Sequence, residues 1–160
     1  MTTKSVYYGY TLRTPNSPYS QWALSQLPIP VSAMFTSDSV ESVVENDVIP
    51  ITGVSFNQVG GKINSDGTFS LPSGLYKIKF ITLVNAAAVD PVSISLKVGT
   101  TTVLQSVAAG STEGVTIQGE TLINCSGCNV SWSLVNTTAG PITPESMGLH
   151  TAQVIIERLL

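Results

Sequence analysis

The sequence predicts an all-β fold, an antiparallel β-sandwich of about ten strands, on three grounds. Short apolar runs alternate with Ser and Thr and are separated by turn residues at regular spacing. Charged residues make up only 11% of the chain, against roughly 25% in an ordinary soluble domain. Val and Thr are abundant, and both residue types favour strands over helices.

Residues 1–30 differ from the rest of the chain and predict an extended arm. They contain four prolines, which disfavour a long helix and a central strand. They also carry five aromatic rings, on Tyr7, Tyr8, Tyr10, Tyr19 and Trp22. Such a segment cannot bury its rings locally. Two interpretations remain, packing along its own domain or docking on a neighbouring subunit, and we favour docking.

An antiparallel sandwich domain is expected over residues 31–160. The predicted strand runs are 31–36, 54–56, 62–64, 68–71, 75–84, 92–98, 102–107, 115–117, 121–123, 130–135 and 151–160. Asp66 and Gly67 predict a tight turn between two of these runs.

The run at 75–84 has the most regular alternation in the chain. Tyr76, Ile78 and Phe80 would share one face of a strand, and Lys77 and Lys79 the other. The aromatic and aliphatic face is therefore expected to point into the core.

The two cysteines, Cys125 and Cys128, have a Cys-x-x-Cys spacing. A zinc site would need further ligands, and His150 is the only histidine. A thioredoxin-like redox pair would begin a helix, whereas the flanking runs here predict strands. We therefore expect a turn whose thiols are free or bridged to each other.

No catalytic motif is present: the sequence lacks a nucleophile elbow, a phosphate-binding loop and a metalloprotease helix. His150 is expected to be a surface or interface residue. Asp38, Glu41, Glu45 and Asp47 predict a solvated acidic face rather than a metal site. We expect no enzymatic activity, no cofactor and no metal.

The overall charge and hydropathy exclude two kinds of partner. A net charge of −3 lacks the basic footprint of a nucleic-acid binder. No apolar stretch is long enough to span a membrane, and the N-terminus lacks the apolar run of a signal peptide.

One stretch resembles the central signature of the tumour necrosis factor and complement C1q-like jelly rolls. In that signature a Phe precedes a Pro-x-Gly corner and an aromatic strand follows. The matching positions are Phe69, Pro72, Gly74, Tyr76 and Phe80. Pro72 and Gly74 would make the corner between two strands, with Gly74 in a backbone conformation that other residues resist.

The resemblance covers about residues 31–160, including the order of the later strands. Two family elements are missing, a Gly-Asp pair near residues 126–129 and a Phe-x-Gly element in the closing strand, and no calcium-loop spacing is seen. The resemblance implies a homotrimer.

With no enzyme motif and an aromatic arm, a structural role in a virus, specifically a phage, is the leading interpretation. We expect a capsid cement or decoration protein in the virion, bound to the major capsid protein or another virion protein. The alternatives are the receptor-binding head of a fibre or spike and a C1q-like binding module.

Overall fold

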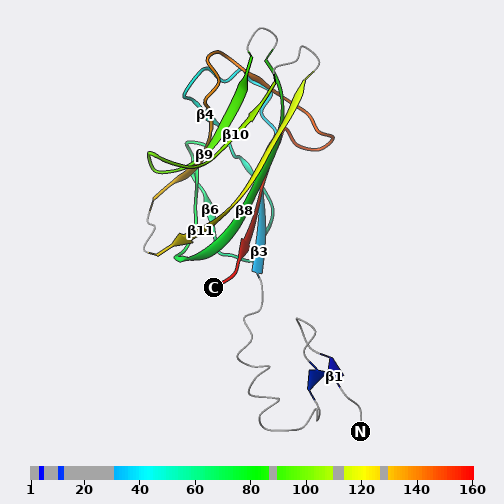
Figure 1. Ribbon diagram of the computed structural model, residues 1–160, viewed down its shortest axis with the longest axis vertical. Helices are drawn as coiled ribbons and strands as arrows, with labels where there is room; N and C mark the ends of the chain where they lie inside the picture. Colours follow the sequence, from blue (N-terminus) through cyan, green and yellow to red (C-terminus); the bar gives the residue numbers. More distant parts are fainter. Residues whose placement is uncertain (1–3, 6–10, 13–30, 87–89, 110–113, 127–129) are drawn as a thin grey trace.

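The computed structural model describes residues 4, 5, 11, 12, 31–86, 90–109, 114–126 and 130–160. In this part of the chain two antiparallel sheets pack as a sandwich (Figure 1). The antiparallel all-β prediction is confirmed.

The first sheet has the strand order β11-β8-β14-β3-β5, and β13 pairs with β8. Its strands are β3 (Val31–Ser37), β5 (Gly53–Asn57), β8 (Gly74–Asn85), β11 (Val115–Cys125), β13 (Thr143–Glu145) and β14 (Ala152–Arg158). The second sheet has the order β10-β9-β12-β7-β6, and β4 pairs with β12. Its strands are β4 (Val48–Ile49), β6 (Lys62–Ile63), β7 (Phe69–Ser70), β9 (Val92–Val98), β10 (Thr101–Ala108) and β12 (Trp132–Asn136).

The alternation predicted for residues 75–84 forms β8, the long strand at the middle of the first sheet. The side chains of Tyr76, Ile78 and Phe80 are fully buried between the sheets. Lys77 and Lys79 are only partly buried, as expected for the opposite face of the same strand. The period-2 pattern therefore identified the core face correctly.

An aromatic cluster joins the two sheets. The rings of Phe35 on β3 and Phe69 on β7 meet edge to face, with centroids 5.5 Å apart. Phe69 also stacks on Trp132 of β12 at 6.1 Å. Such ring pairs add stabilisation of about 0.5–1.5 kcal/mol beyond simple area burial. The indole N–H of Trp132 is buried, and no described residue accepts a hydrogen bond from it.

The tight turn predicted at Asp66 and Gly67 connects β6 to β7. Gly67 has a φ of 79°, in the left-handed region that favours glycine. The Asp66 carboxylate accepts hydrogen bonds from the hydroxyl of Thr68 at 2.6 Å and from its backbone N–H at 3.1 Å. These bonds, the hydroxyl bond first, hold the pKa of Asp66 below its ordinary value.

Three features of the strands differ from the prediction. The two short strands predicted around residues 115–123 form one continuous strand, β11. Its Gly119 lies beneath β10, where a Cβ would run into Ser106 and Leu104. The short strand β13 was not predicted, because Pro144 lies at its centre. Residues 4–5 pair with residues 11–12 as β1 (Lys4–Ser5) and β2 (Thr11–Leu12), a ladder that the extended-arm prediction did not include.

Candidate functional site

The corner before β8 is fixed by hydrogen bonds and by close packing against the C-terminal residues. The Tyr76 hydroxyl donates to the backbone carbonyl of Pro72 at 2.7 Å. Burial raises the pKa of Tyr76, an effect that the nearby Arg158 charge partly opposes. The Arg158 guanidinium in turn donates to the carbonyl of Ser73 at 2.8 Å. Residues 72–76 are thus tied to the closing strand β14.

The expected reason for glycine at position 74 is wrong. Gly74 is not one of the glycines with a positive φ. A Cβ at this position would instead lie 2.8 Å from both Arg158 Nε and the Leu160 carbonyl oxygen. Lack of space, rather than an unusual backbone conformation, requires glycine here.

The outward-facing side of the first sheet carries both apolar and charged side chains. We call this surface the outer sheet face. Its apolar members are Met34, Phe56, Ile81, Leu83, Leu122 and Ile155, and its charged members are Lys77, Lys79, Glu120 and Glu157.

The strand register aligns these side chains in rows. One row crosses all five strands of the main path, in the order Glu120, Lys79, Ile155, Met34 and Phe56. Directly opposed residues on one face lie about 4.5–5.5 Å apart at Cβ, so the row is a continuous strip. Its outer end is accessible, because Phe56 is 42% exposed.

The outer sheet face was not predicted from the sequence. Its signal was present in the alternation: Ile81 and Leu83 lie on the lysine side of β8, not on the core side. Ile155 takes the same side on β14, between the buried Val154 and Ile156. Apolar residues on both sides of a strand indicate that both sides can be covered by protein.

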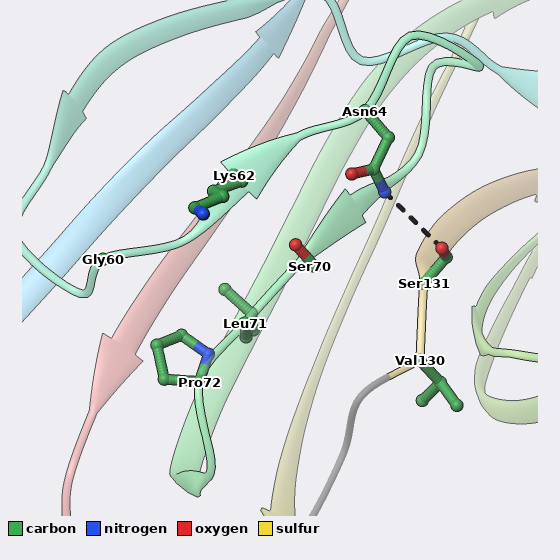
Figure 2. A pocket seen from close by; sticks show the side chains of 8 residues that line it. All are labelled: Gly60, Lys62, Asn64, Ser70, Leu71, Pro72, Val130 and Ser131. Carbon is green, nitrogen blue, oxygen red and sulfur yellow. Dashed lines mark hydrogen bonds between the residues drawn. The ribbon is translucent and has the colours of Figure 1, made fainter.

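A depression of about 480 Å³ lies beside β6 and β7, on the second sheet (Figure 2). Its polar side chains are those of Lys62, Asn64, Ser70 and Ser131, and Leu71, Pro72 and Val130 add apolar walls. The Asn64 amide donates to the Thr68 hydroxyl at 2.8 Å and reaches Ser131 Oγ at 3.5 Å. The described lining includes no carboxylate, imidazole or thiol, so it offers an ammonium group and hydroxyls for binding but no acid–base pair.

His150 does not lie in this depression. Its Nδ1 contacts Asp38 Oδ1 at 2.7 Å, and this pair connects the residues after β3 to those before β14. The acidic residues Asp38, Glu41, Glu45 and Asp47 are all exposed. Over the described ranges, no group of three His, Cys, Asp or Glu side chains is placed to hold a metal ion.

Cys125 is the last residue of β11, fully buried and disulfide-bonded. Cys128 lies outside the described residues. The ring-bearing residues of the predicted arm, Tyr7, Tyr8, Tyr10, Tyr19 and Trp22, also lie outside them. Within the part of the chain that is described, no helix has the length and hydropathy needed to cross a membrane.

Comparison with solved structures gives a consistent match over most of the chain. The Eiger TNF of S. frugiperda superposes with a TM-score of 0.68 at 11% identity, covering 83% of this chain and 94% of that one. The globular domain of zebrafish complement 1qA gives 0.51 at 10% identity, covering 79% and 93%. The fold is a jelly roll of the TNF and C1q type.

The jelly roll is established by structure alone. The sequence matches no protein-family model and no curated protein. The PRD1 vertex protein P5 gives a TM-score of 0.45 at 20% identity, covering 82% of this chain and 96% of that one. That score is too low to establish a shared fold with P5.

Proposed function

We propose that this chain is a non-enzymatic structural protein of a virion, a homotrimer that cements or decorates the capsid. The outer sheet face is the observation that carries the proposal. Leu122 on this face is 61% exposed, and it shares the surface with five further apolar side chains. Several apolar side chains that are exposed or only partly buried among a few charged ones on an outward sheet face favour a protein interaction site.

A second copy of the chain is the partner that this face fits best. Its four charged residues, Lys77, Lys79, Glu120 and Glu157, comprise two cations and two anions, so the surface is complementary to itself rather than to a strongly acidic or basic partner. The resemblance to TNF and C1q jelly rolls adds the expected symmetry, since proteins of that type form trimers about a threefold axis.

The described polar groups support binding rather than catalysis. His150, the only histidine in the chain, contacts Asp38 at 2.7 Å. The depression beside β6 offers Lys62 without a neighbouring acid or imidazole. General acid–base catalysis needs such a group within hydrogen-bond reach of the substrate.

Residues 1–30 are the proposed anchor to the major capsid protein or another virion protein. Their rings can bury apolar area and keep a polar tip for hydrogen bonding. The arm enters the sandwich at Val31, which pairs with Arg158 near the end of β14. That end of the sandwich also holds the corner at Ser73, whose carbonyl accepts a hydrogen bond from Arg158.

The experiment compares virions assembled with the full chain and with residues 2–25 deleted. We expect the full chain in purified particles at a copy number that is a multiple of three per site. The truncated protein should remain trimeric but fail to attach. A control in which a Gly/Ser segment of equal length replaces residues 2–25 separates the loss of the rings from the loss of length. Normal coating by the truncated protein would rule out the arm as anchor.

A receptor-binding head is the second candidate, and the depression in Figure 2 favours it. Neither Lys62 nor Ser70 has a side-chain hydrogen bond or ion pair within the described residues. Both can therefore bind a carboxylate or a sugar hydroxyl. If Lys62→Ala reduces adsorption of virions to host cells without changing particle composition, this second function is favoured over capsid decoration.

A further inference from the structure

The centre of the outer sheet face is charged rather than apolar. Lys77, Lys79, Glu120 and Glu157 line, together with Ile155, a depression of about 280 Å³. These side chains come from β8, β11 and β14, three neighbouring strands of one sheet. Any partner that covers this face must therefore accommodate two cations and two anions.

The ion pairing within one copy of the chain is incomplete. The register places Lys77 opposite Glu157 and Lys79 opposite Glu120. Lys77 nevertheless forms its ion pair diagonally, with Glu120, at 3.4 Å between Nζ and Oε2. Among the described residues, Lys79 and Glu157 are left with no ion pair.

The lack of an ion partner for these two charges is harmless in the free copy and unfavourable once the face is covered. In water each is solvated and needs no partner. Once the face is covered, an unpaired buried charge loses its hydration and becomes strongly unfavourable. A second copy supplies the missing partner for both, because each copy presents one unpaired cation and one unpaired anion. A uniformly acidic or basic partner would satisfy only one of them.

We propose that Lys79 of each copy forms an ion pair with Glu157 of the neighbouring copy, and that this pair sets the register of the trimer. The inference rests on the proposed homotrimer. Around a threefold axis one such pair recurs at each of the three interfaces. A shifted arrangement that placed Lys79 near another lysine would be disfavoured by like-charge repulsion.

The test is a charge reversal at each position and at both together, with the full-length chain. Lys79→Glu and Glu157→Lys should each raise the protomer concentration needed for half-assembly by roughly 100-fold or more. The double variant, Lys79→Glu with Glu157→Lys, should restore assembly, since it recreates the pair with its signs exchanged. A mixture of the two single variants should restore less, because a ring of three cannot alternate two kinds of subunit.

Lys97→Glu is the matched control, since it reverses a partly buried lysine on β9 of the other sheet. It should assemble like the unchanged chain. Far-UV circular dichroism and thermal unfolding check that each variant is folded. If a reversal prevents folding, Lys79→Met and Glu157→Gln replace it, and each should still weaken assembly by leaving the other charge unpaired.

Three results separate the inference from the function on which it rests. If the unchanged chain is a trimer and the single reversals assemble equally well, the ion pair is wrong and the trimer stands. A folded double variant that stays dissociated would also overturn the pair. If the unchanged chain is monomeric at micromolar concentration, the proposed trimer itself fails.

Discussion

The Tyr76 hydroxyl donates a hydrogen bond to the backbone carbonyl of Pro72, at an oxygen–oxygen distance of 2.7 Å. The ring of Tyr76 is fully buried at the start of β8, so this bond joins the core to the corner that precedes the strand. Aromatic packing alone could be supplied by Phe. The hydroxyl therefore has a specific structural role, which can be measured.

Tyr76→Phe is expected to lower the free energy of unfolding by about 0.5–1.5 kcal/mol, because the Pro72 carbonyl loses its partner while the ring is kept. Urea unfolding of both proteins gives the difference. The variant should keep the oligomeric state of the unchanged chain, since Tyr76 faces the core and not the outer sheet face. Equal stability of the two proteins would show that water replaces the hydroxyl at no cost.

The same residue predicts a loss of stability in alkaline solution. Burial raises the pKa of Tyr76 above its ordinary value of 10.0. The folded state therefore favours the neutral phenol, and its contribution to stability is complete below the unfolded-state pKa. That contribution declines as pH rises from about 10 through the folded-state pKa. The stability difference between the unchanged chain and Tyr76→Phe, measured by urea unfolding across this range, should shrink as pH rises; a constant difference would contradict the shift.

Replacing both cysteines should leave the fold and the assembly intact. Cys125 is disulfide-bonded and fully buried, but a bridge to the nearby Cys128 would close only a short loop. Short loops give a small entropic stabilisation, about 2 kcal/mol or less. We expect Cys125→Ser with Cys128→Ser to unfold cooperatively at a moderately lower temperature. The corresponding Ala pair separates the lost cross-link from the burial of a hydroxyl. Stoichiometric zinc in the unchanged protein, or an unfolded Ala pair, would contradict the structural interpretation of these cysteines.

Ile155→Asp should disrupt assembly without unfolding the domain. Ile155 is only partly buried and lies in the middle row of the outer sheet face. A carboxylate there would lie directly opposite Lys79 of the same copy, so it would compete with the neighbouring copy's Glu157 for that ammonium and leave a charge without a partner once the face is covered. The matched control is Val107→Asp, at a position 58% exposed on the second sheet. Size-exclusion chromatography should show a smaller species for the first variant only.

The local sequence pattern predicted the elements whose determinants are near one another in the chain. The alternation of Tyr76, Ile78 and Phe80 defined β8, and Asp66–Gly67 defined the turn after β6. The requirement for Gly74 could not be predicted in this way, because the atoms that exclude a Cβ belong to Arg158 and Leu160, which are distant in sequence.

The neighbours on the outer sheet face could not be predicted either, because they depend on pairing between strands that are distant in sequence. The sequence places Lys79 opposite the core side of its own strand, but it does not show that Ile155 lies beside it. That neighbour is fixed only when β14 pairs with β8. Sequence alternation thus identified which residues face outward, and long-range pairing determined which of them meet.

The homotrimer is tested most directly by the mass of the full-length chain in solution. Sedimentation equilibrium at micromolar protein concentration should give a single species with three times the 16.8 kDa mass of the chain. A species that stays at 16.8 kDa as the concentration rises would contradict the trimer, and with it the assignment of the outer sheet face as the surface between copies.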